Sequence, residues 1–348
     1  MKKPDIWLLS AYRADSHAAW ADWLIDNFPQ IEWQRLELPG RYFSWRIRGN
    51  PLSWLDTLPV NQPDLIIATS MVDLATIKGL HPRLARVPAY YYFHENQFAY
   101  PVSEHQTQSI EPQMVQLYGA LTAEKLLFNS NYNRDTFLDG VDNLLKQMPD
   151  AIPTGIRQKL QSKCEIYPVP FEPIAPASEK DNKLIIWNHR WEYDKAPEIF
   201  ANAMLELAER GVDFKLALLG ARPSQTPDML TLLRKKLKDR IIADDKVDID
   251  TYRHLLGKAS IAVSTSLHEF QGLSILEAAS SGAIPLVPDA LCYPEQYTEQ
   301  YRYPAGDQTA LVDRLAQWLC KGLPPVADVS PWYTSNLLSN WKALLNQT

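Results

Sequence analysis

The stretch SIAVSTSLHEFQGLSILEAASSGAIPLVPD, Ser260 to Asp289, contains an apolar run, a polar loop, a helical pattern and a second apolar run. This order of strand, helix and strand is typical of a βαβ unit, in which a crossover helix joins two parallel strands. Gly272 stands directly before the helical pattern, where it lets a ligand approach the backbone closely. Because ligands collect beyond the carboxyl ends of parallel strands, the stretch predicts a binding site in the loop before the helix.

The same alternation of apolar runs and helical patterns continues through the whole chain. It predicts strands at 5–11, 31–38, 64–70, 87–95, 125–130, 163–170, 183–188, 214–220, 260–266 and 283–289. It predicts helices at 16–28, 53–58, 113–122, 132–148, 196–210 and 227–238. The segment 171–182 combines prolines, small residues and charges without periodicity, as a linker does. We therefore expect an α/β protein with two doubly wound parallel-sheet domains, 1–172 and 183–325, facing across a cleft. An amphipathic helix in 326–348 would pack back on the first domain.

Composition narrows the class of protein. The chain has 348 residues, of which 46% are hydrophobic, enough for two cores. No run approaches the roughly 18 apolar residues of a membrane span, and Pro4 and Asp5 interrupt the N-terminal apolar stretch. The three cysteines form no CxxC, which argues against a disulfide framework and a zinc site. We expect a cytoplasmic protein without membrane contact, whose net charge of −6 requires a local basic patch for any polyanionic partner.

Two glutamates flank the expected helix start in the opening stretch. Glu277 lies one turn into the helix on the same side as Ser274, where its carboxylate suits the two hydroxyls of a ribose. Glu269 precedes the helix and suits a second polyol, and the N–H groups of Leu273 and Ser274 suit an anion. Alternatively, both glutamates only favour the positive end of the helix. That explains Glu269 but leaves Glu277 as a buried charge without a reason.

Two cations follow the first strand after the linker, in WNHRWEYDKAPE, residues 187–198. Arg190 can chelate phosphate oxygens and Lys195 acts as a point charge, a pairing that suits a diphosphate. Taken alone, an ordinary solvated loop is the better interpretation. The position at the same sheet edge as Glu277 favours the binding role.

In the first half, polar residues follow the fourth expected strand, in YYYFHENQFAYP at 90–101. His94 suits a sugar hydroxyl or a developing charge, and Glu95 or Asn96 suits an acceptor, although a single histidine is often structural. Near the first strand, Ser16 is expected mainly to cap a helix and His17 to face the cleft, and both are candidate contacts for the acceptor.

The segment RLELPGRYFSWRIRGN, residues 35–50, interleaves arginines with aromatic residues. We interpret it as a loop in which Arg41, Arg46 and Trp45 contact an acceptor, because cations neutralise phosphates and aromatic planes stack on bases. A surface loop with a few anchoring aromatics is about equally consistent with it. In contrast, the pair Asp248 and Asp250 is not interpreted as a metal clamp, because Asp250 suits a helix cap.

Two glutamates separated by seven residues at a glycine-opened helix, together with Arg190 and Lys195, resemble the retaining GT-B glycosyltransferases of family 4. The resemblance implies two Rossmann-like domains, a nucleotide-sugar donor held by the second, and no required metal or other cofactor. By the same resemblance, Arg190 and Lys195 bind the donor diphosphate and act in catalysis. Glu277 binds the ribose, Glu269 contacts the transferred sugar, and backbone from Gly272 to Ser274 contributes. His94 and Glu269 would orient the sugar.

The N-terminal half narrows the resemblance further. LPGRYFSWRIRGNPLSW, YYFHENQFAYPV and LLFNSNYNRDTFL look like the N-terminal domain of the tRNA-queuosine α-mannosyltransferases. That family transfers mannose from GDP-mannose to queuosine in an aspartate tRNA, so tRNA is the implied partner. One departure is that Ala14 and Asp15 stand where relatives carry two glycines.

Two other interpretations remain open from the sequence. One keeps the fold and donor but has a lipid or saccharide acceptor. The other is a non-catalytic protein that binds a nucleotide sugar or RNA. The sequence indicates neither the base of the donor nor its sugar, and it leaves the oligomeric state open.

Overall fold

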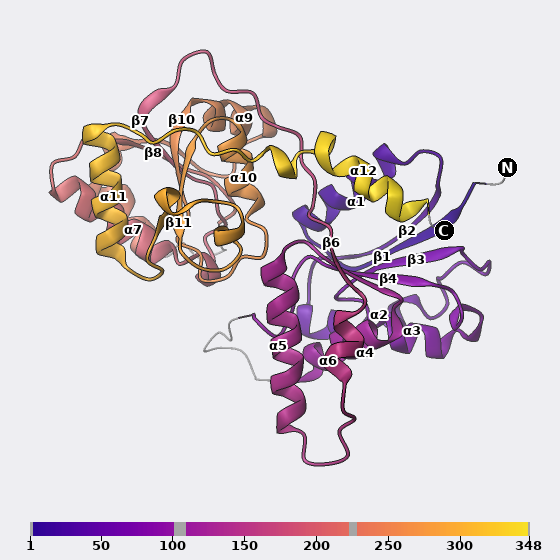
Figure 1. The fold of residues 1–348 in the computed structure, drawn as a ribbon. Helices are drawn as coiled ribbons and strands as arrows, with labels where there is room; N and C mark the ends of the chain where they lie inside the picture. Colours follow the sequence, from indigo (N-terminus) through magenta and orange to yellow (C-terminus); the bar gives the residue numbers. More distant parts are fainter. Residues whose placement is uncertain (1–2, 101–108, 223–227, 347–348) are drawn as a thin grey trace. The chain divides into compact units, whose positions relative to one another are not determined.

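The computed structural model describes residues 3–100, 109–222 and 228–346 and divides the chain into two compact units (Figure 1). The first unit contains 1–170 and 337–348, and the second contains 171–336. Each unit is built around one parallel sheet of six strands. Among the described residues, no helix has both the length and the apolar character that crossing a membrane requires.

The first unit has the strand order β2-β1-β3-β4-β5-β6, and every pairing is parallel. Its strands are β1 (Asp5–Arg13), β2 (Glu32–Pro39), β3 (Leu65–Thr69), β4 (Ala89–Phe93), β5 (Lys125–Phe128) and β6 (Cys164–Ile166). All residues of β3 and β4 are buried. Such continuously apolar strands fit a sheet with helices on both faces.

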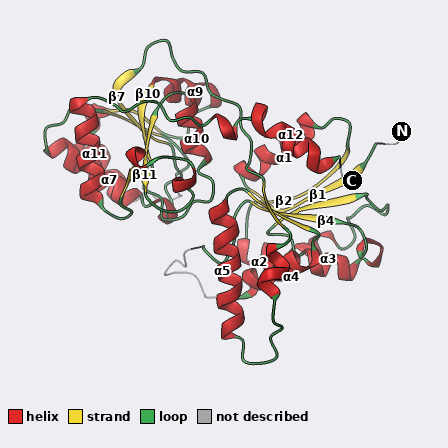
Figure 2. Ribbon diagram, in the orientation of Figure 1, coloured by secondary structure: helices red, strands yellow, loops and turns green. Residues whose placement is uncertain are grey.

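Helices cover both faces of this sheet, with α1 and α12 on one face and α2 to α5 on the other (Figures 1 and 2). The helices are α1 (Asp15–Asn27), α2 (Phe43–Trp54), α3 (Leu74–Leu80), η1 (Pro82–Leu84), α4 (Glu111–Thr122), α5 (Asn131–Gln147), α6 (Ile156–Gln161) and α12 (Thr334–Leu345). Trp341 of α12 is fully buried and lies against Trp20, Trp23 and Tyr92. The end of the chain is therefore part of the core of the first unit.

The segment 35–50, interpreted as a loop, contains the end of the strand expected at 31–38, a short turn and the first two turns of a helix, so only the loop assignment of 43–50 was wrong. A helix was expected at 53–58, whereas α2 begins at Phe43 and contains Pro51. The reason is tertiary: the buried Asn50 side chain donates to the carbonyl oxygens of Arg46 and Met71 and accepts from the N–H of Asp73. These bonds hold a helix that glycine and proline disfavour locally.

The second unit has the order β12-β11-β10-β7-β8-β9, again with only parallel pairings. Its strands are β7 (Asp181–Trp187), β8 (Lys215–Leu218), β9 (Ile241–Asp244), β10 (Ala259–Val263), β11 (Ile284–Pro288) and β12 (Arg302–Tyr303). The chain runs outward in one direction from β7 and in the other from β10, which are neighbours. The boundary between them is the topological switch point at which doubly wound sheets bind ligands.

The helices of the second unit are η2 (Tyr193–Lys195), α7 (Pro197–Glu209), α8 (Asp228–Lys236), η3 (Lys238–Arg240), α9 (Ile249–Lys258), α10 (Leu273–Ser280), η4 (Tyr293–Glu295), η5 (Glu299–Tyr301), α11 (Gln308–Lys321) and η6 (Ser330–Trp332). The cap expected at Asp250 was wrong by two residues: Asp248 caps α9 by accepting from the N–H groups of Asp250 and Thr251. The cap expected at Ser16 was also wrong, because α1 begins at Asp15 with Ala14 at the cap position.

Candidate active site

Two loops meet at the switch point of the second unit. The first, 188–196, leaves β7, and the second, 264–272, leaves β10. Backbone N–H groups of Leu267 and His268 donate to the carbonyl oxygen of Asp194, at 2.8 and 3.2 Å. The hydroxyl of Thr265 donates to the carbonyl oxygen of Lys195 at 2.8 Å. These bonds hold the two loops together, so their side chains share one region.

Lys195 is the buried cation of this region, with 10% of its side chain exposed. Its Nζ lies 3.0 Å from Oε2 of Glu269 and 3.3 Å from Oδ2 of Asp194, and it donates to the carbonyl oxygen of His268 at 2.7 Å. Burial alone would lower the pKa of Lys195, but the charges of Glu269 and Asp194 outweigh it and raise that pKa. Lys195 therefore stays protonated at neutral pH.

Glu269 is the matching acid, with 19% of its side chain exposed. Burial works to raise the pKa of its carboxyl, but the nearby Lys195 charge outweighs this effect, and the pKa falls to about 2. The carboxylate also accepts hydrogen bonds from the backbone N–H groups of Phe270, at 3.2 Å, and Gly272. Glu269 is therefore ionised and fixed in position between Lys195 and the start of α10.

Arg190 lies at the exposed side of the same cluster, with 53% of its side chain exposed. Its guanidinium contacts Glu192 at 2.9 Å and Asp194 at 3.7 Å. The structure thus brings Arg190, Lys195 and Glu269 together, and Asp194, which sequence reasoning missed, links the two cations. The signal for Asp194 was weak because an acidic residue in a polar loop is common.

The start of α10 completes this cluster, which we call the donor-side cluster (Arg190, Asp194, Lys195, Glu269 and the backbone of 272–274). Gly272 has a φ of 65° and caps the helix. An added Cβ there would lie 3.0 Å from the ring of Tyr293 and adopt a strained conformation. Leu273 and Ser274 supply N–H groups in the first turn, which a helix leaves without internal acceptors. These groups favour an anionic ligand.

His189 lies beside the donor-side cluster and is neutral. Its Nδ1 is 3.2 Å from the hydroxyl of Ser274. Burial, followed by the charge of Lys195, lowers the pKa of His189 to about 3. The positive charge of the cluster therefore comes from Lys195 and Arg190 alone.

Glu277 is held by α9 rather than by the cations. Its Oε2 accepts a hydrogen bond of 2.8 Å from the Tyr252 hydroxyl, and Asn188 Nδ2 lies 3.1 Å from the same hydroxyl. Burial raises the pKa of Glu277, although the bond from Tyr252 and the charge of Arg253 oppose this rise. No local pattern indicates Tyr252 or Asn188 in this role, because both are distant from Glu277 along the chain.

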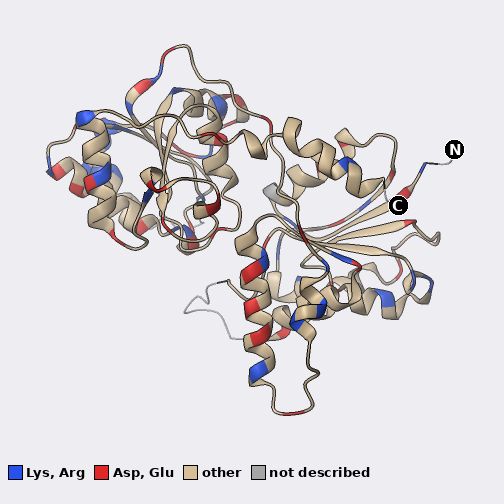
Figure 3. Cartoon of the chain, viewed as in Figure 1, with Lys and Arg blue, Asp and Glu red and all other residues tan. Residues whose placement is uncertain are grey.

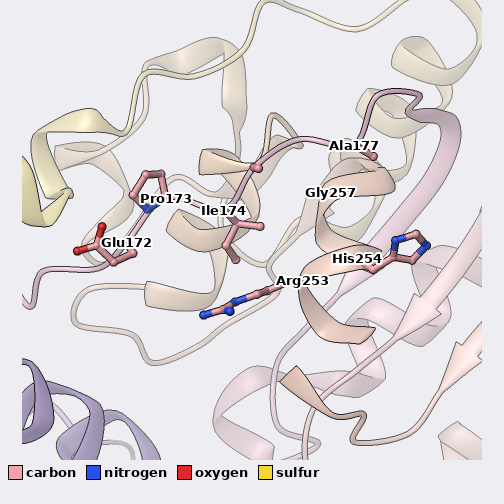
Figure 4. A pocket seen from close by; sticks show the side chains of 8 residues that line it. Glu172, Pro173, Ile174, Ala177, Arg253, His254 and Gly257 are labelled. Atoms are coloured by element: carbon pink, nitrogen blue, oxygen red, sulfur yellow. The ribbon is translucent and has the colours of Figure 1, made fainter. Parts of the chain in front are cut away.

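A cavity of about 500 Å³ lies between α9 and the linker (Figure 4). Its walls are Glu172, Pro173, Ile174, Ala175, Ala177, Arg253, His254 and Gly257. The linker is pinned there, because the N–H of Ala177 donates to the carbonyl oxygen of Gly257 at 3.1 Å. No residue of the donor-side cluster lines this cavity.

In the first unit, the rings of His17 and His94 lie in contact, with their centroids 4.2 Å apart and their planes tilted by 32°. Nδ1 of His17 lies 2.7 Å from the carbonyl oxygen of Tyr12, and the rings of Trp20 and Tyr92 surround His94. Burial, with a smaller contribution from His17, lowers the pKa of His94 well below its ordinary value. Within the described residues, Nε2 of His94 is buried without a hydrogen-bond partner.

Glu95 and Asn96, which follow His94, differ in exposure and in hydrogen bonding. Glu95 is partly exposed, and its backbone carbonyl accepts from the hydroxyl of Ser70. Asn96 is fully buried: its amide donates to Asn133 and Thr136, and its oxygen accepts from backbone N–H groups at 98 and 99. The geometry therefore assigns Asn96 a structural role and removes it from the acceptor contacts. The side chain of Ser16 lies outside what the structure describes.

The arginine and aromatic segment divides between β2 and α2. Arg41 and Trp45 are exposed, whereas Arg46 is partly buried and contacts the hydroxyl of Ser53 at 3.3 Å. Arg48 is occupied by ion pairs with Asp73 and Glu111. Of the predicted acceptor residues here, Arg41 and Trp45 are the more accessible ones. No group of three or more His, Cys, Asp or Glu side chains within the described part of the chain is arranged to hold a metal.

Comparisons with known proteins match both halves of the chain. The family described as tRNA-queuosine alpha-mannosyltransferase N-terminal matches residues 5–171, and the glycosyl transferases group 1 family matches residues 182–321. A tRNA-queuosine alpha-mannosyltransferase of Drosophila melanogaster is 33% identical over 315 residues, covering 86% of this chain and 84% of the fly protein.

Solved structures share the fold. A sucrose-phosphate synthase from Thermosynechococcus elongatus has a TM-score of 0.72 and 12% identity, over 99% of this chain and 98% of that one. The Anabaena protein HepE, in complex with UDP and glucose, has a TM-score of 0.69 and 14% identity, over 99% and 100%. The two α/β units with parallel six-stranded sheets therefore have the GT-B fold of glycosyltransferases.

Proposed function

The chain belongs to the tRNA-queuosine alpha-mannosyltransferase family, and on that premise we propose that it transfers mannose from GDP-mannose to the queuosine nucleoside of tRNA(Asp), with retention at the anomeric carbon. It is a glycosyltransferase. The structural observation that carries the proposal is the buried, protonated Lys195 at the switch point of the second unit, beside Arg190 and the start of α10.

The donor-side cluster suits a nucleotide diphosphate. Lys195 and Arg190 supply positive charge, and the first N–H groups of α10 supply further donors to phosphate oxygens. Glu269, ionised and fixed by three hydrogen-bond donors, accepts from hydroxyls of the transferred sugar. Glu277 accepts from the ribose, with Tyr252 setting the orientation of its carboxylate.

The chemistry follows from the charge that develops as the donor breaks. When the bond between the anomeric carbon and the diphosphate oxygen breaks, negative charge grows on the leaving group. A cation already ordered in a buried site stabilises that charge without reorganising. Asp194 and Glu269 keep Lys195 protonated despite burial, so the cation is present when the bond breaks. The leaving phosphate takes the proton of the attacking hydroxyl, so no side-chain nucleophile is needed.

The first unit supplies the acceptor-side groups in this proposal. A neutral His94 with an unsatisfied buried Nε2 is suited to a hydrogen bond with a sugar hydroxyl. The ring of His17 packs against it at 4.2 Å between centroids. Glu95, partly exposed beside this pair, remains a candidate contact for the acceptor.

The test is a transfer assay in which the donor and the acceptor tRNA are varied separately. The purified chain is incubated with GDP-mannose, GDP-glucose, UDP-glucose or UDP-galactose and with tRNA(Asp) that carries or lacks queuosine. Nucleosides from the digested tRNA are then analysed by mass spectrometry. We expect one added hexose on queuosine, with GDP-mannose as the preferred donor. Transfer to lipid extract instead, or transfer to tRNA without queuosine, contradicts the proposal. Donor binding without any transfer indicates a non-catalytic protein.

Lys183→Ala is a matched control for variants of the cluster. Lys183 is an exposed lysine of the same unit that pairs with Asp213, away from the switch point. We expect this variant to transfer as the wild type does. A loss of transfer in Lys183→Ala equal to that in Arg190→Ala would mean that general surface charge, rather than the cluster, matters.

A further inference from the structure

Two aromatic side chains stand in solvent at the start of α2. Tyr42 is 70% exposed and Trp45 is 55% exposed. Exposed large rings that lie on one turn indicate an interaction surface more often than scattered apolar residues do. Tyr42 also has a φ of 57°, a strained value for a tyrosine. The backbone at Tyr42 is therefore strained at the point where this ring is exposed.

Trp45 is supported from beneath by Gly49, one turn further along α2. An added Cβ at Gly49 would lie 2.8 Å from Cδ2 and Cζ2 of the indole and nearer still to Cε2. The indole therefore lies across the backbone of Gly49, and its exposed area is on the outer side. Glycine inside a helix lowers helix stability relative to alanine. At Gly49, the absence of a side chain leaves the space that the indole occupies. Here it permits a flat ring held in one orientation.

The charge beside the rings is positive. The guanidinium of Arg41 lies 5.5 Å from the centroid of the Tyr42 ring. By contrast, α5 of the same unit carries Asp135, Asp139 and Asp142 (Figure 3). Since the chain as a whole has a net charge of −6, a polyanion has to bind where cations are locally exposed. The start of α2 meets that requirement.

We propose that Trp45 and Tyr42 form a stacking platform for unpaired bases of the RNA acceptor, with Arg41 contacting the backbone phosphates; this rests on the proposed function. Flat exposed rings with an adjacent guanidinium are the means by which proteins bind single-stranded RNA, whose bases offer open faces. The supporting glycine lowers the cost of ordering the indole, because the ring is already oriented before RNA binds.

The first experiment measures RNA affinity by fluorescence anisotropy, using a labelled anticodon stem-loop with a seven-base loop and a fully paired duplex of equal length. For Trp45→Ala we expect about 10-fold weaker binding of the stem-loop, the loss typical of one stacked base. Trp45→Phe should recover part of it. Leu52→Ala is the control, because Leu52 is 61% exposed on the same helix and lies outside the platform. GDP-mannose affinity should be unchanged in all three variants.

The second experiment tests the support of the ring. Gly49→Ala favours the helix locally but displaces the indole, so we expect weaker binding of the stem-loop although Trp45 is still present. Circular dichroism should show no loss of helix. Unchanged affinity in Trp45→Ala, or equal wild-type affinity for duplex and stem-loop, overturns the platform alone. If wild-type protein transfers no sugar to tRNA and does not bind the stem-loop, the proposed function itself fails.

Discussion

Each unit contains one cluster of polar side chains that are shielded from solvent. The two clusters differ in whether their groups carry charge. In the donor-side cluster of the second unit, buried groups remain ionised: Lys195 keeps its proton and Glu269 loses its own. In the first unit, His17 and His94 lie among aromatic rings, and burial keeps His94 neutral. Burial acts on both groups, yet Lys195 is charged and His94 is neutral. The reason is that acidic partners surround Lys195, whereas aromatic rings surround His94.

This difference matches the two tasks of the proposed reaction. A departing diphosphate needs fixed positive charge, which is stable in a buried site only when acids offset its desolvation. A sugar hydroxyl needs a hydrogen bond of fixed direction, and a neutral imidazole supplies one without attracting the phosphates. Substitutions in the two clusters should affect these two tasks separately.

Lys195→Met should lower both transfer and stability. It leaves Asp194 and Glu269 buried without their cation, and breaking a buried pair costs about 3–5 kcal/mol. We expect kcat/KM to fall by more than about 10³-fold, consistent with loss of a buried electrostatic contact to the leaving group. Thermal unfolding and steady-state transfer are the measurements. Lys195→Met/Glu269→Leu should recover part of the lost Tm and none of the activity; recovered activity would contradict the catalytic role of the charge.

Arg190→Ala should separate catalysis from stability. Half of this side chain is exposed, and exposed ion pairs contribute about 0–1 kcal/mol, so Tm should change little. The loss of charge beside the leaving group should lower kcat by about 10²-fold. Transfer assays run alongside Lys183→Ala check both statements. A Tm that falls as far as in Lys195→Met would show that Arg190 is mainly structural.

His94→Gln should lower kcat/KM by about 10-fold, the usual effect of one weakened hydrogen bond, and leave donor affinity intact. Because the pKa of His94 lies well below its ordinary value, the wild-type pH profile should show no inflection from His94 between about pH 6 and 8. The pH dependence of kcat/KM for both proteins is the measurement. An inflection near neutral pH that disappears in His94→Gln means that the histidine is charged in the free enzyme.

Glu277→Gln should weaken GDP-mannose binding by about 10-fold at neutral pH, since the ribose loses a charged acceptor. Burial raises the pKa of Glu277, so acidification protonates it earlier than an ordinary glutamate. Wild-type affinity should therefore fall as the pH decreases, and the affinity of Glu277→Gln should stay flat. In Tyr252→Phe, the bond that favours the ionised carboxylate is absent, so the fall should begin at a higher pH. Calorimetry across pH 5 to 8 distinguishes the three.

The positions of the candidate residues were more predictable than their surroundings. Arg190, Lys195, Glu269 and Gly272 could be placed near one another because each follows a strand of a parallel sheet. The hydrogen bond from Tyr252 to Glu277 could not be predicted, because the two residues lie on different helices and no periodicity links them. The burial of Asn96 was equally hidden, since a polar residue after a strand gives no sign of its partners on α5.

The sequence alone determined the alternation of strands and helices, the parallel sheets and the loops that carry charge, because these depend on local periodicity and on chain order. Only the tertiary structure decided where α2 begins and which buried groups are ionised. It also decided that the side-chain amide of Asn96 bonds to α5 and is not available to a ligand. Asn50 reaches Met71 across the fold, and Lys195 reaches Glu269 from another loop. Ionisation in particular depends on the charges within a few ångströms of a group, and the fold brings those charges together from distant parts of the chain.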